Sequence, residues 1–118
     1  MRLIIAATFA VLSAFAISAS AQSISATEAA SHIGGHATVC GTIAGEHTAT
    51  NSRGTPTFIN LDKPYPHQVF TILIWGDERV AVGDFPESGR VCATGCITEY
   101  HGVPEIVLHD LHNWYVPK

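Results

Sequence analysis

The amino-acid sequence predicts an all-β domain, a five-stranded Greek-key barrel preceded by one short N-terminal helix. Residues 54–75 read as two strands, Thr57–Leu61 and Val69–Trp75, joined by a proline-rich loop. The second of these strands is apolar on both faces, which is typical of a central strand that is covered on both sides. Gly41 and Gly95 lie inside two further strand patterns, and glycines there indicate the bends of a sheet that coils into a barrel.

The other elements follow from local patterns. A capping box formed by Ser25 and Glu28 predicts the start of the short helix, and the pair Gly34-Gly35 predicts its end. The first, fourth and fifth strands are expected at His36–Ala44, Arg90–Ile97 and Pro104–Leu108. The segments between and after them are expected to be a mobile polar loop at 45–55, a helix-free connection at 77–89, a turn at 98–103, and a tail at 109–118 whose Trp114 and Tyr115 cover the barrel.

The N-terminal residues have the features of a secretory signal peptide. Arg2 precedes an apolar run from Leu3 to Ile17, and the small residues Ala19-Ser20-Ala21 form a cleavage site. The apolar run is shorter than the roughly 20 residues that a transmembrane helix needs. We therefore expect a signal peptide at 1–21, a single domain at 22–118, a periplasmic or secreted location, and no membrane attachment after cleavage.

Charge and cysteine content narrow the functional classes. The formal net charge of −4 excludes capture of nucleic acid by a general positive field, so any such binding must depend on a local patch. Protonation of the seven histidines in weak acid would make the net charge more positive. Three cysteines in an exported chain predict one disulfide, from Cys40 to Cys92 or Cys96, with one thiol left over.

No motif for catalysis or cofactor binding is found. The sequence has no nucleophile elbow, P-loop or dinucleotide fingerprint, so we expect neither an enzyme nor a cofactor. His109 and His112, with Asp110 between them and His101 nearby, provide nitrogen donors for weak metal binding as one alternative. Their spacing matches no established closed site, and surface histidines are the preferred interpretation.

Six segments carry a resemblance to a known family. They are 38–43 (TVCGTI), 56–61 (PTFINL), 65–66 (YP), 70–76 (FTILIWG), 91–97 (VCATGCI) and 102–107 (GVPEIV). Together they resemble small exported bacterial OB-fold proteins that are described as nucleic-acid-binding-like, close to the tRNA-anticodon type of OB domain. The resemblance implies that the first and fourth strands are antiparallel neighbours. This brings Cys40 near Cys92 or Cys96, and the Cys40–Cys92 pair is the working assignment.

The resemblance also implies where a ligand binds. The binding face of an OB fold lies on its second and third strands, between the loops that follow strands one and four. Stacking platforms and cations are needed there to hold a single strand. The residues expected on or near this face are Arg53, Lys63, Tyr65, Trp75, Arg79 and Tyr100.

Each of these residues has a structural alternative. For Trp75 the core is the preferred interpretation, for Tyr65 a rigid loop plug is preferred, and the cations are compatible with ordinary surface charges. Asn60 is expected to support the barrel end and Glu105 to be exposed. The expected function is a non-catalytic module that binds single-stranded nucleic acid or oligonucleotide. A periplasmic module that binds an exported protein is the main alternative.

Overall fold

Eight strands and four short helical turns make up the computed structural model, which describes residues 3–13 and 23–118. Residues 3–13 are exposed and form neither helix nor strand. The predicted cleavage site at Ala19-Ser20-Ala21 lies outside the described residues. No helix within the described ranges is long and apolar enough to cross a membrane.

The strands, in chain order, are β1 (Ser23–Ser25), β2 (His36–Thr48), β3 (Thr57–Leu61), β4 (Phe70–Ile74), β5 (Arg90–Cys96), β6 (Thr98–Tyr100), β7 (Val103–Val107) and β8 (Trp114–Tyr115). The 3₁₀ turns are η1 (Glu28–His32), η2 (Gly76–Glu78) and η3 (Leu111–Asn113), and the α-helix is α1 (Arg79–Val82). The expectation of an all-β fold is confirmed, while the expected count of five strands is replaced by eight.

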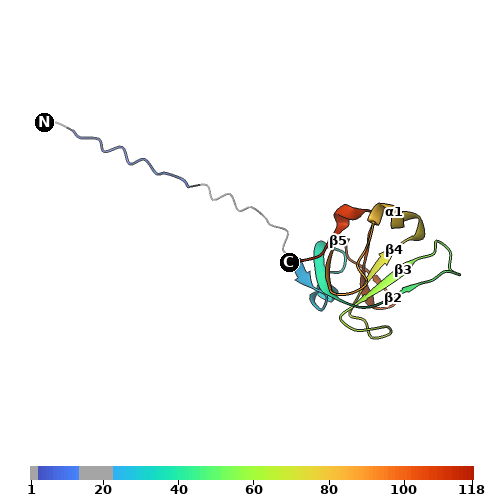
Figure 1. Ribbon diagram of the computed structural model, residues 1–118. Coiled ribbons are helices and arrows are strands. Elements are labelled where there is room, and N and C mark those ends of the chain that lie inside the picture. The colour runs from blue at the N-terminus through green and yellow to red at the C-terminus, as the bar shows by residue number, and fades with distance from the viewer. Residues whose placement is uncertain (1–2, 14–22) are drawn as a thin grey trace.

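One curled sheet contains these strands in the order β6-β7-β4-β3-β2-β5-β8, and β1 pairs with β2 (Figure 1). All adjacent pairs are antiparallel except β4–β7 and β1–β2, which are parallel. The antiparallel pairing of β2 with β5 confirms that the predicted first and fourth strands are neighbours.

The strands β5 and β6, which lie far apart in the order of the sheet, are connected through a single residue. Ile97 separates β5, which pairs with β2, from β6, which pairs with β7. Its backbone amide donates to the Gly35 carbonyl, and its own carbonyl accepts from the Gly34 amide, both at 2.8 Å. Because Ile97 bonds to this turn, the strand breaks there. This break explains why residues 98–100, expected as part of a turn, form the separate strand β6.

The bend of β2 lies later in the strand than predicted. The pairing of β2 with β3 shifts between Ile43 and Gly45, where the extra residue makes a bulge, whereas Gly41 remains in register with Val91. A β-carbon at Gly41 would lie 3.1 Å from Leu61 Cδ1 and 3.0 Å from an Asp62 carboxylate oxygen. Glycine at position 41 therefore allows close packing against Leu61 and Asp62, whereas the bulge lies at Ile43–Gly45.

Alternate residues of the strands face the core. Its fully buried members include Val39, Ile59, Leu61, Phe70, Ile72, Val91, Ile106 and Leu108. The predicted capping-box bonds form between Ser25 and Glu28, and Ala29 of η1 packs into the core. The expectation of a helix-free connection at 77–89 is wrong, because α1 forms there and buries Val82.

The tail and the disulfide close the structure. The Trp114 indole donates to the Val82 carbonyl at 2.9 Å, and its ring lies 4.9 Å from that of Phe85, so Trp114 covers the core as predicted. The same expectation for Tyr115 is wrong, because Tyr115 is exposed. Cys40 and Cys92 are directly opposite each other on β2 and β5, and they form a disulfide. The working assignment of this pair is confirmed, and Cys96 is a free, exposed thiol.

Candidate functional site

The outward face of β3, β4 and β7 is hollowed. Ile59, Ile72 and Ile106 point into the core from these three strands. Because strand side chains alternate, the neighbouring Phe58, Thr71 and Glu105 point to the other side. There they line a cavity of about 450 Å³. The residues around it are Phe58, Asn60, Tyr65, Pro66, Gln68, Thr71, Tyr100, His101, Val103 and Glu105.

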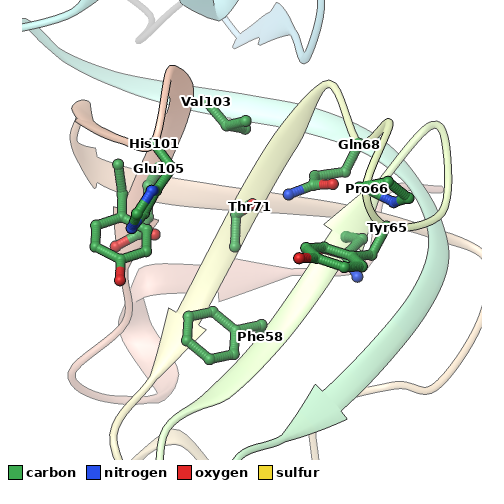
Figure 2. A pocket seen from close by; sticks show the side chains of 10 residues that line it. Phe58, Tyr65, Pro66, Gln68, Thr71, His101, Val103 and Glu105 are labelled. Carbon is green, nitrogen blue, oxygen red and sulfur yellow. The ribbon is translucent and has the colours of Figure 1, made fainter.

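Figure 2 shows how this cavity is built. Thr71 and Phe58 lie along its floor, on β4 and β3. Tyr65 and Pro66, from the loop between β3 and β4, stand on one side, and Glu105 with His101 stands on the other. The two walls therefore come from segments more than thirty positions apart in the sequence.

A second cavity of about 300 Å³ continues the first. Phe58, Tyr100 and Glu105 line both cavities, so the two are parts of one depression. Arg53, Leu73 and Trp75 belong to the second part, together with Ser52 and Pro56. We call the combined depression, lined by the residues of both cavities, the aromatic groove.

The loop between β2 and β3 is fixed at one end of the groove. The Gly76 amide donates to the Gly54 carbonyl at 2.9 Å. A β-carbon at Gly54 would lie 2.9 Å from Trp75 Cε3, so only glycine allows the loop to rest on the indole ring. Gly54 also has φ +78°, a conformation that glycine adopts without strain. This contact orients Trp75 and holds Arg53 beside the groove.

The aromatic side chains of the groove are accessible. Tyr65 is 76% exposed, Tyr100 is 57% exposed, and Trp75 is 39% exposed. The preferred interpretation of Trp75 as a core residue is therefore wrong. The Tyr100 ring meets the His101 imidazole edge-on, with ring centroids 4.1 Å apart. The groove thus presents several aromatic surfaces against which a flat ligand can stack.

Glu105 lies where the two parts of the groove meet. Its expected exposure is wrong, because only 7% of the residue is accessible. Burial raises the pKa of the Glu105 carboxyl. Among the described residues, no salt bridge to this carboxylate is found. The groove therefore contains a mostly buried acid at the point where its two parts meet.

The six expected site residues are separated into two groups. Arg53, Tyr65, Trp75 and Tyr100 lie around the aromatic groove. Lys63 is exposed on the loop between β3 and β4 and lines neither part of the groove.

Arg79 has a structural role outside the groove. Its guanidinium donates to the Thr55 carbonyl at 3.2 Å and to the Thr57 hydroxyl at 2.7 Å. It lines a different cavity of about 280 Å³, together with Glu46 and Asp84. Its bonds connect α1 to the end of the loop between β2 and β3.

Sequence reasoning did not identify Phe58, Gln68, Thr71 and Glu105 as groove residues. Phe58 and Glu105 could have been found from alternation alone, since each lies between two buried neighbours of its strand. Gln68 lies in a loop and carries no such signal.

The histidine tail makes a local contact. His109 Nδ1 lies 2.8 Å from a Glu78 carboxylate oxygen. Within residues 3–13 and 23–118, no group of three or more His, Cys, Asp or Glu side chains is arranged to hold a metal ion.

Comparison with known proteins gives a fold relationship. No protein-family model and no curated protein matches the sequence. The structure resembles part of a putative aspartyl-tRNA synthetase from Leishmania major Friedlin, with a TM-score of 0.54 and 11% sequence identity. The match covers 82% of this chain and 21% of the synthetase chain, so this chain spans about a fifth of that protein. At this identity the similarity concerns the fold alone.

Proposed function

We propose that this chain is a non-catalytic binding module that holds single-stranded nucleic acid in the aromatic groove. The observation that carries the proposal is the position of the groove. It lies on the outward face of β3 and β4, with Arg53 and Tyr100 contributed by the segments that flank them. This is where OB folds bind oligonucleotides. The fold similarity to a protein named as a tRNA synthetase supports the same class of ligand.

The proposal includes a more specific fold. We take β5 and β6 as one strand bent at Ile97. With β2, β3, β4 and β7 it then makes the five-stranded Greek-key barrel of the OB fold, to which β1 and β8 are short additions. The single domain extends over residues 22–118.

Stacking supplies most of the binding energy in this mechanism. Each base stacked on an aromatic side chain contributes roughly 1–3 kcal/mol. Tyr65, Trp75 and Tyr100 offer accessible rings along the groove, and Phe58 lies on its floor. The charge contribution is small, because Arg53 is the groove's arginine and the whole chain has a net charge of −4. Binding is therefore expected to be weak and moderately sensitive to salt.

Fluorescence anisotropy with a labelled single-stranded oligonucleotide tests the proposal. Tyr100→Ala is expected to weaken binding by roughly tenfold to a hundredfold, which corresponds to one lost stacking contact. Arg53→Ala should flatten the plot of log affinity against log salt by about 0.7, the contribution of one phosphate contact to a single strand. Lys63→Ala is the matched control, since Lys63 lies outside the groove. Unchanged affinity in both groove variants would refute the nucleic-acid proposal.

We further propose that the chain is exported and that the signal peptide at 1–21 is removed. The Cys40–Cys92 disulfide supports this, because disulfides persist in oxidising compartments. Mass spectrometry of the protein recovered from a periplasmic extract should give a chain that begins at Gln22. Recovery of the unprocessed chain from the cytoplasm would contradict export.

A protein partner is the second candidate. The observation that favours it is the charge of the groove, in which buried Glu105 faces the same space as Arg53. The Glu105 carboxylate can bind a basic side chain of a partner protein, just as it can bind a nucleic-acid base. The two candidates differ in a competition experiment. If the groove is a protein site, a bound partner protein stays bound in excess oligonucleotide, whereas if the groove holds nucleic acid, the oligonucleotide occupies it.

A further inference from the structure

The centre of the aromatic groove contains an acceptor for which the described residues provide no partner. Only 7% of Glu105 is accessible, and no salt bridge or side-chain hydrogen bond to its carboxylate is found in the part of the chain that the structure describes. The Thr98 hydroxyl donates to the backbone carbonyl of Glu105 and not to its side chain. Burial disfavours the charged form of this carboxyl group, and a ligand that supplies donors offsets that cost.

The surroundings of Glu105 favour a flat ligand. Thr71 is its register partner on β4, and His101 stands beside it, from the turn between β6 and β7 (Figure 2). Tyr100, at the end of β6, lines the same cavity. Phe58 lines both parts of the groove beside it. A planar ring that stacks on these aromatic side chains can direct one edge at the carboxylate.

The four bases differ in how well their hydrogen-bonding edges match a carboxylate. A carboxylate presents two acceptor oxygens side by side and accepts two parallel hydrogen bonds. Guanine has two adjacent donors, N1–H and the N2 amino group. Adenine and cytosine each place an acceptor next to their amino group on the pairing edge, and thymine has one donor between two acceptors.

We propose that Glu105 makes the groove selective for guanine, which it recognises through the N1–H and N2 donors. This inference rests on the proposed nucleic-acid function and names the base that the site prefers. Guanine can come from a strand or from a free nucleotide, and competition between the two distinguishes these sources.

Four labelled pentamers of dT that differ only in the central base, which is G, A, C or T, provide the test. One guanine per strand avoids self-association of guanine-rich sequences. At neutral pH and fixed salt, the G strand should bind roughly tenfold to a hundredfold more tightly than the T strand, the discrimination expected of one bidentate pair.

Glu105→Gln is the decisive variant because it keeps the side-chain shape and changes its hydrogen bonding. Glutamine offers one acceptor and one donor, a pattern that can match the pairing edge of every base. The variant should therefore lose the preference for G over the other three strands. A purely structural role for Glu105 would weaken the binding of all four strands equally and keep their order, so loss of the order separates recognition from folding. Lys63→Ala again serves as the control and should keep the parent order.

The outcomes are distinct for the two proposals. If the parent binds all four strands equally, or if Glu105→Gln leaves the order unchanged, the guanine inference is overturned and the nucleic-acid function stands. If neither the strands nor guanosine monophosphate binds, both are overturned. Binding of guanosine monophosphate without binding of any strand supports the guanine site and overturns the strand function. Preference for the G strand without competition by guanosine monophosphate identifies the strand as the source.

Discussion

Removal of the Cys40–Cys92 disulfide should strongly destabilise the fold. The two residues are directly opposite on β2 and β5 and are separated by 52 positions in the sequence. The bridge therefore closes a loop that contains β3, β4 and α1, including most of the groove floor. On the chain-entropy model, closing a loop of this length stabilises the folded state by about 4 kcal/mol. For a domain of this size, such a change lowers the melting temperature by roughly 15–30 °C.

Urea unfolding followed by tryptophan fluorescence measures this effect in the double variant Cys40→Ala/Cys92→Ala. Cys92 is fully buried, so the double variant also loses some packing. The parent protein under reducing conditions separates the two contributions, because reduction removes the bond and keeps both side chains. Cys96→Ala is the matched control, and its free energy of unfolding should change by less than about 0.5 kcal/mol because Cys96 is exposed and free.

One result would refute this reasoning. If both the reduced parent and the double variant unfold within about 1 kcal/mol of the oxidised parent, the loop-closure estimate is wrong for this chain. The hydrogen bonds between β2 and β5 would then be sufficient to hold the two strands together.

Three further perturbations test the environment of the groove. Gly54→Ala and Gly89→Ala both place a β-carbon at positive φ, at a cost of about 1–3 kcal/mol each. A β-carbon at Gly54 also meets Trp75, whereas one at Gly89 meets no atom within 4 Å, so only Gly54→Ala should increase acrylamide quenching of tryptophan fluorescence. Arg79→Met removes two hydrogen bonds and should lower the free energy of unfolding by about 1–3 kcal/mol, with oligonucleotide affinity retained. Burial raises the pKa of Glu105, so the folded state holds this proton more tightly than the unfolded state, and parent stability falls as pH rises from the ordinary carboxyl value to the raised one. Glu105→Gln should therefore match the parent below about pH 4 and exceed its stability at pH 7, as measured by urea midpoints. If the difference in stability between Glu105→Gln and the parent is the same at both pH values, the titration of Glu105 does not contribute to stability.

The five longer strands could be predicted from the sequence because each forms its own periodic pattern. Thr57–Leu61 is predicted to the residue, and the other four differ from the structure mainly at their ends. The strands β1, β6 and β8 contain two or three residues and show no period. They exist because a longer strand lies beside them, as β2 does for β1 and β5 for β8. Such pairing depends on the tertiary structure, which local patterns do not contain.

The candidate site was predictable in part for a similar reason. Arg53, Tyr65, Trp75 and Tyr100 were selected by residue type and by position relative to the strands, and they lie together around the groove. Arg79 has an equally suitable side chain, but its direction is determined by α1, which the sequence did not predict. The contacts of a cationic side chain on a loop or short helix depend on the tertiary structure around it, which local sequence patterns do not contain.

Glu105 is the residue for which sequence reasoning and structure differ most informatively. A strand that begins beside Pro104 suggests an exposed edge, and a carboxylate on such an edge suggests solvent. The structure instead places β7 between β4 and β6, so β7 is not an edge strand, and only 7% of Glu105 is accessible. A buried acid without a donor lowers stability at neutral pH, and such exceptions to burial rules concentrate at functional sites. If Glu105→Gln proves both more stable and altered in base preference, the same desolvation accounts for the stability cost and for the selectivity of the groove.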